Sequence, residues 1–131
     1  MHSINYRSTF IEVSPDTRAT AGMIPPKPGT IAALQYEMLC AAPYTLTSDD
    51  LLTRITAVRT GRTDEESAVR AELFCKGQAC LRTSPLVKTY GWGVHHDDQA
   101  RVALVSFGSP EYERLLADEN VRKIKGLKSR R

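Results

Sequence analysis

The side chains with the greatest potential for chemistry lie in one short stretch of the sequence, between residues 82 and 97. This stretch contains Arg82, Trp92, His95, His96 and Asp97. An imidazole titrates near neutral pH, a guanidinium binds carboxylates and phosphates, and an indole can form the apolar wall of a groove. We therefore expect a groove beside residues 76–97 that binds a small anionic ligand through Arg82, Trp92, His95 and Asp97.

Two further residues are weaker candidates for the same groove. Ser84 directly precedes Pro85, which predicts a helix start whose free N–H groups would attract an anion. Lys88 follows one turn later and could supply a positive charge. The alternative is that Ser84 only caps the helix while Arg82 and Lys88 stay in water.

The two adjacent histidines do not predict a metal site. Successive side chains of a strand point to opposite faces, so His95 and Asp97 share one face and His96 lies on the other. Two ligands are fewer than zinc requires, and we expect neither a metal nor a cofactor.

A hydrolase that depends on His95 and Asp97, with or without a metal, is the alternative function. We leave open whether the protein is an enzyme, and no catalytic residue is assigned.

Two glycines, Gly91 and Gly93, flank Trp92 and leave the strand surface next to His95 bare. Glycine within a strand often marks the close approach of a ligand or of another backbone. The bare strand therefore predicts either a ligand beside His95 or tight packing of a helix or of the proline-rich loop. Both explanations stay open at this point.

Hydrophobic periodicity and turn residues predict the elements that would position these side chains. Strands are expected at residues 8–13, 92–96 and 101–107, with a tight turn between the last two. Helices are expected at about 31–41, 48–60, 64–76 and 85–90, and again from residue 110. These elements indicate an α+β fold: a single domain in which helices pack on a small antiparallel sheet.

Length and composition limit the class of protein. The chain of 131 residues is 41% hydrophobic and 25% charged, which is typical of one soluble globular domain, and no apolar run is long enough to cross a membrane. We divide it into a globular domain at 1–121, which includes a proline-rich surface loop at 14–29, and a basic C-terminal tail at 122–131. Cys40, Cys75 and Cys80 include no C-x-x-C pair, which indicates reduced thiols and a cytoplasmic location.

The positive charge is concentrated at the C-terminal end. Residues 122–131 hold six of the 18 lysines and arginines and no acidic residue, so the remaining chain is net negative. We expect a solvated tail and no nucleic-acid binding, because no aromatic residue in the tail could stack on bases. The alternative is an interaction module whose tail docks an acidic partner or RNA. The oligomeric state is left open.

Several short motifs resemble a known family. They are KGQACLR (76–82), YGWG (90–93) and HHD (95–97), together with TFIEV (9–13) and LQYEML (34–39). The chain resembles, over nearly its whole length and most specifically at residues 76–97, a bacterial and partly fungal family of small proteins catalogued as a domain of unknown function. The resemblance implies one domain and a cytoplasmic location, and it carries over no catalytic residue.

Overall fold

A four-stranded sheet forms the centre of the computed structural model, which describes residues 2–128. Strands β1 (Thr9–Glu12), β2 (Trp92–His96) and β3 (Val102–Ser106) pair antiparallel, in the order β3-β2-β1. Strand β4 (Arg122–Lys125) adds to β1 in parallel. The expected antiparallel sheet is therefore corrected to a mixed one, because a fourth strand from the segment expected to be a tail pairs in parallel with β1.

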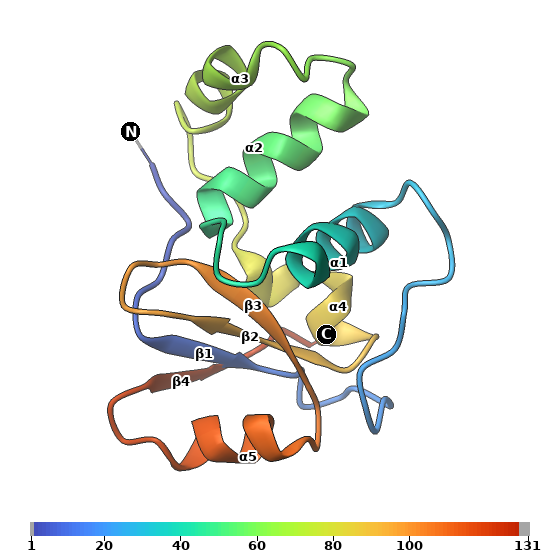
Figure 1. Cartoon of the computed structure of the whole chain (residues 1–131), viewed down its shortest axis with the longest axis vertical. Coiled ribbons are helices and arrows are strands. Elements are labelled where there is room, and N and C mark those ends of the chain that lie inside the picture. Colours follow the sequence, from blue (N-terminus) through green and yellow to red (C-terminus); the bar gives the residue numbers. More distant parts are fainter. Residues whose placement is uncertain (1, 129–131) are drawn as a thin grey trace.

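Helices cover both faces of this sheet (Figure 1). One face carries a helical layer that consists of α1 (Ile31–Ala41), α2 (Ser48–Arg59), α3 (Glu66–Leu73), a short 3-10 helix η1 (Leu81–Thr83) and α4 (Pro85–Lys88). The opposite face carries α5 (Pro110–Ala117). The expected α+β class, a single domain with helices packed on a sheet, is confirmed.

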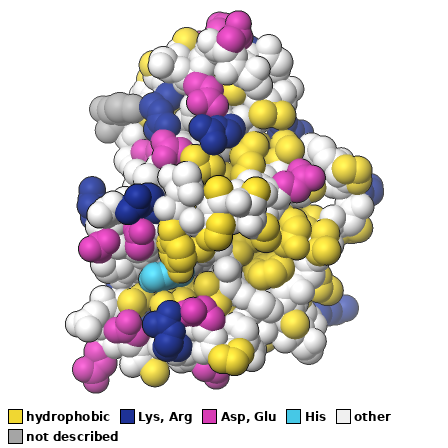
Figure 2. Space-filling view, viewed as in Figure 1, with side chains coloured by type: hydrophobic (Ala, Val, Ile, Leu, Met, Phe, Trp, Pro, Cys, Tyr) yellow, Lys and Arg dark blue, Asp and Glu magenta, His cyan; other side chains and the backbone are white. Residues whose placement is uncertain are grey.

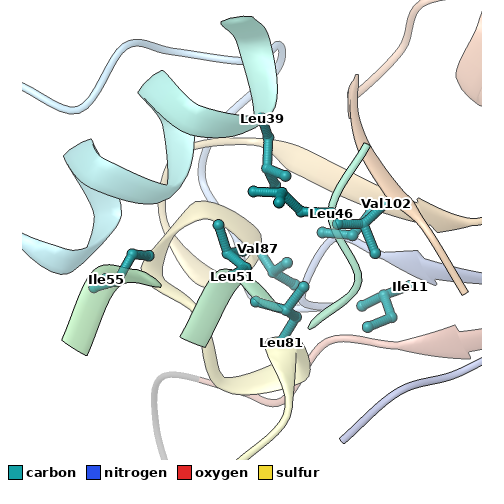
Figure 3. Close-up of a cluster of buried hydrophobic side chains, with 9 residues drawn as sticks. Ile11, Leu39, Leu46, Leu51, Ile55, Leu81, Val87 and Val102 are labelled. Carbon is teal, nitrogen blue, oxygen red and sulfur yellow. The ribbon is translucent and has the colours of Figure 1, made fainter. Parts of the chain in front are cut away.

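Two hydrophobic clusters fix these layers because neighbouring residues of β1 point to opposite faces. Ile11 belongs to the larger cluster, on the side of α1, α2 and α4 (Figure 3), whose buried members are Ile11, Leu39, Leu46, Leu51, Ile55, Leu81, Val87, Val94 and Val102. Phe10 belongs to the smaller cluster, under α5, whose buried members are Phe10, Val13, Val105, Tyr112, Leu115 and Val121. The face on which a strand residue lies therefore decides which helices it can meet.

Helix α2 begins with a capping box. The hydroxyl of Thr47 accepts a 3.1 Å hydrogen bond from the backbone N–H of Asp50, whose carboxylate accepts a 3.0 Å bond from the N–H of Thr47. These bonds satisfy two N–H groups that a helix start would otherwise leave unpaired. The start of α2 is therefore fixed by local hydrogen bonds.

The expectation of a solvated tail from residue 122 is wrong for the described part of that segment. The N–H of Arg122 donates to the carbonyl of Ser8, and that of Gly126 donates to the carbonyl of Glu12, each at 2.8 Å. Ile124 packs against the larger cluster. Basic side chains suit an edge strand because they discourage pairing with another chain, so a high charge does not exclude a strand. Residues 129–131, the rest of the expected tail, lie outside the described residues.

The proline-rich segment at residues 14–29 forms no helix or strand, but it is held against the sheet. The N–H of Met23 donates to the carbonyl of Tyr90, and the N–H of Gly22 donates to the hydroxyl of Ser106, each at 2.8 Å. A Cβ added at Gly91 would lie 2.3 Å from the carbonyl oxygen of Ala21. The loop itself is thus the backbone that requires a glycine at position 91.

Candidate functional site

The structure places two of the predicted site residues on opposite faces of the sheet. Trp92 packs against Tyr36 of α1, with ring centroids 5.6 Å apart, and its indole N–H donates to the carbonyl of Met23 at 2.9 Å. His95 lies on the α5 side, where its Nδ1 is 2.8 Å from the hydroxyl of Tyr44. Burial lowers the pKa of His95 below its ordinary value, while the nearby carboxylates of Asp97 and Glu111 act in the opposite direction.

The other predicted residues have separate structural roles. Oδ1 of Asp97 accepts 2.9 Å hydrogen bonds from two backbone N–H groups of the β2–β3 turn, so this carboxylate anchors the turn. Nε of Arg82 donates to the carbonyl of Lys125, which ties η1 to β4. Lys88 ends α4, where a positive charge suits the helix terminus. The groove expected from Arg82, Trp92, His95 and Asp97 is therefore not assembled.

Gly93 is explained by packing. An added Cβ would lie 2.7 Å from Phe10 and 2.9 Å from Tyr112, both in the cluster under α5. Of the two explanations offered for the glycines, the close contacts favour packing, with the loop at Gly91 and with aromatic side chains at Gly93.

A cavity of about 390 Å³ lies instead between α1, α2 and the segment 78–85. It is lined along α2 by one continuous stripe of the helix: Ser48, Leu51, Leu52, Ile55, Thr56, Arg59 and Thr60. This spacing of three and four residues places all seven side chains on the same face of the helix. The stripe changes from apolar at its centre to polar and basic at its C-terminal end.

Two polar side chains of the cavity wall, Ser84 and Cys80, already have hydrogen-bond partners. The hydroxyl of Ser84 donates a 2.6 Å hydrogen bond to Oε1 of Gln35, and both residues are buried. The hydroxyl of Tyr6 donates to the Sγ of Cys80 at 3.4 Å, and this bond together with burial raises the pKa of Tyr6. A ligand that reaches this part of the wall would therefore meet polar groups that are already satisfied.

Ser48 on the same wall lies 3.3 Å from Nε2 of His96, which is completely buried. Burial lowers the pKa of His96 to about 4, so the ring is neutral at physiological pH. Its Nδ1 has no hydrogen-bond partner among the described residues. A histidine that activates a serine is normally oriented through its other nitrogen, so this pair fits a structural contact better than a nucleophile and its base.

Arg59 supplies the positive charge at the open end of the cavity. It is exposed at the C-terminal end of α2, and its guanidinium forms no hydrogen bond or ion pair with a described residue. Ile31 of α1, also exposed, lines the same space. In the space-filling view, hydrophobic side chains gather over α1 and where α1 meets α2 (Figure 2). The cavity thus combines an apolar interior with a cation at its mouth.

Two negative observations complete the description of the site. Within residues 2–128, no group of three or more histidines, cysteines, aspartates or glutamates is arranged to hold a metal ion. In the same range, no helix has both the length and the apolar character needed to cross a membrane.

The fold and the cavity define a small α+β protein with an interhelical hollow. The sequence model of one family, described as a family of unknown function (DUF6157), matches residues 1–131, and the chain belongs to this family. No curated protein and no solved structure gives a significant match.

Only Ser84, among the six predicted site residues, lines the cavity. The residues missed were mainly those of the α2 stripe, together with Gln35 and the start of the segment 78–85. One signal was present in the sequence: Thr56, Arg59 and Thr60 continue the apolar face of Leu51, Leu52 and Ile55 at helical spacing. The apolar part of this face is by itself typical of a helix that packs on the core. The change to polar residues further along the same face is therefore the feature that indicates a binding site.

Proposed function

We propose that the protein binds a small, mainly apolar ligand with an anionic group in the cavity between α1, α2 and residues 78–85. The observation that carries the proposal is the cavity itself, whose volume of about 390 Å³ lies in the range of small-molecule sites. Apolar surface would supply most of the affinity, at roughly 25 cal/mol per Å² removed from water. Ser84, expected from the sequence to bind the ligand, takes part as a fixed element of the wall.

Arg59 determines the orientation of the ligand in this proposal. A charge contact in an exposed position contributes only about 0–1 kcal/mol, less than the burial of an alkyl chain. The guanidinium therefore favours ligands whose negative group stays at the mouth while the apolar part enters. This arrangement keeps the expected anionic ligand and moves its site from Trp92 and His95 to α2.

The two alternative functions receive less support. A hydrolase at His95 and Asp97 would need a carboxylate free to act, whereas Asp97 is engaged in the β2–β3 turn. A docking tail would need residues 122–125 to be available, whereas they form β4. We infer a cytoplasmic location from the cysteines Cys40, Cys75 and Cys80, which are unpaired thiols.

Calorimetric titration with decanoate and with decanol tests the proposal. We expect decanoate to bind the unmodified chain and Leu52→Trp, which fills the apolar part of the cavity, to abolish binding while the protein stays folded. Arg59→Gln should weaken decanoate by a few-fold and leave decanol unchanged. Arg54→Gln is the matched control, because Arg54 lies on α2 in a surface ion pair with Glu66 and does not line the cavity. Failure of both probes to bind would refute the proposal.

A further inference from the structure

A second cavity of about 240 Å³ adjoins the first on the side of α3. Thr56, Thr60 and Gln78 line both cavities. Because the same three residues line both, the two spaces are neighbours along α2, and we call them the first and the second lobe. The stripe from Ser48 to Thr60 extends for about 18 Å at the rise of an α-helix, so a ligand that occupied both lobes would be elongated.

The second lobe has a different chemical character from the first. Its charged residues are Arg62, Glu72 and Lys76. Arg62 donates to both carboxylate oxygens of Glu72, at 2.8 and 2.7 Å, and approaches Glu65, so its charge is neutralised locally. The ammonium group of Lys76, like the guanidinium of Arg59 in the first lobe, forms no hydrogen bond or ion pair with a described residue. Two uncompensated cations thus line the two lobes.

Hydrogen-bond donors lie where the lobes meet. The side-chain N–H₂ of Gln78 donates one bond to the carbonyl of Leu73 at 2.7 Å, which fixes the amide and leaves its second N–H available. The hydroxyl of Thr56 has no partner among the described residues. An anionic head group in the second lobe would meet these two donors and Lys76, with Arg59 in the lining of the neighbouring lobe.

We propose that the second lobe binds a phosphate-bearing head group, so that the ligand is a single-chain amphiphile with a phosphate monoester. This inference rests on the proposed function of the first lobe. A phosphate carries a charge of about −1.5 to −2 at neutral pH and has three acceptor oxygens, which suits Lys76 and two hydrogen-bond donors better than a carboxylate does. Lysine binds phosphate as a point charge, and arginine binds it through its planar fork.

Titration of the full chain with decyl phosphate and decanoate tests the inference. We expect decyl phosphate to bind about tenfold more tightly, since a charge-assisted hydrogen bond is sufficient for such a ratio. Lys76→Gln should remove most of this advantage and leave decanoate affinity within about twofold. Lys27→Gln, in the loop at 14–29 and outside both lobes, is the matched control.

The possible outcomes separate the two proposals. If decanoate binds, but decyl phosphate binds no more tightly or Lys76→Gln affects the two probes equally, the phosphate head group is refuted and the apolar site stands. If neither probe binds, the proposed function and this inference both fail. Selective loss of decyl phosphate affinity in Lys76→Gln supports the assignment.

Discussion

The hydroxyl of Ser84 joins two helices across the wall of the cavity through its 2.6 Å hydrogen bond to Gln35. The same oxygen accepts the backbone N–H of Leu86 at 3.2 Å and so caps α4. One small side chain therefore both starts a helix and holds α4 against α1. The shape of the hollow depends on this contact.

Replacing Ser84 should destabilise the fold more than the loss of a helix cap alone. Ser84→Ala removes the cap and leaves the buried Oε1 of Gln35 unpaired, so we expect a loss of about 2–4 kcal/mol in the free energy of unfolding. Ser109→Ala is the control, since Ser109 caps α5 in the same way without a second buried partner, and it should cost about 1 kcal/mol. Equal losses in chemical denaturation would contradict a structural role for the Ser84–Gln35 bond.

A methyl group at position 93 should be costly. Gly93→Ala would collide with the rings of Phe10 and Tyr112, and overpacking of this kind costs about 1–3 kcal/mol. Gly77→Ala is the matched control, because its nearest atom would be Nδ1 of His2 at 4.0 Å. Thermal and chemical unfolding of both variants measures the difference. A normal stability of Gly93→Ala would instead revive the idea of an open strand face beside His95.

Strand β4 should contribute to stability even though its sequence is basic. Ile124→Ala removes apolar contacts with the larger cluster, and we expect a loss of about 2 kcal/mol for this half-buried position. Lys128→Ala, at an exposed position beyond the strand, should change stability by less than about 0.5 kcal/mol. If Ile124→Ala unfolds like the unmodified chain, residues 122–125 are not held in the sheet.

His96 should make the fold sensitive to acid. Its pKa is about 4 in the folded protein, whereas the ordinary value of 6.5 applies to the unfolded chain. Between these two pH values the unfolded chain therefore binds a proton more readily than the folded protein does. The free energy of unfolding is therefore highest above pH 6.5, and it decreases by up to about 3 kcal/mol as the pH falls towards 4. His96→Gln should flatten this part of the pH profile of unfolding free energy. An unchanged slope would show that other groups cause the acid sensitivity.

The sequence predicted local elements better than their assembly. The helix at 31–41 and the strand at 92–96 were confirmed because Thr30, Pro43 and the β2–β3 turn mark their ends through local chemistry. Strand β4 was missed because its partner, β1, lies more than 100 residues away and its charged side chains resemble a solvated tail.

The sequence also did not predict how the residues that line the cavity come together. The alternation used for His95 and His96 also puts Trp92 on the face opposite His95, and helices cover both faces of the sheet. The cavity needs Gln35, the α2 stripe and residues 78–85 to converge, and no pattern within one element contains that information. Only the change from Ile55 to Thr56 and Arg59 on one helical face pointed towards a site.

Ligand binding in the cavity between α1 and α2 is tested most directly by methyl NMR of the full chain during titration with decanoate. We expect progressive shifts for the methyl groups of Leu51, Leu52 and Ile55, which line the cavity. Leu115 and Val105, under α5 on the other face of the sheet, should not move. Shifts confined to Leu115 and Val105, or no shift at any of these methyl groups at saturating decanoate, would contradict ligand binding between α1 and α2.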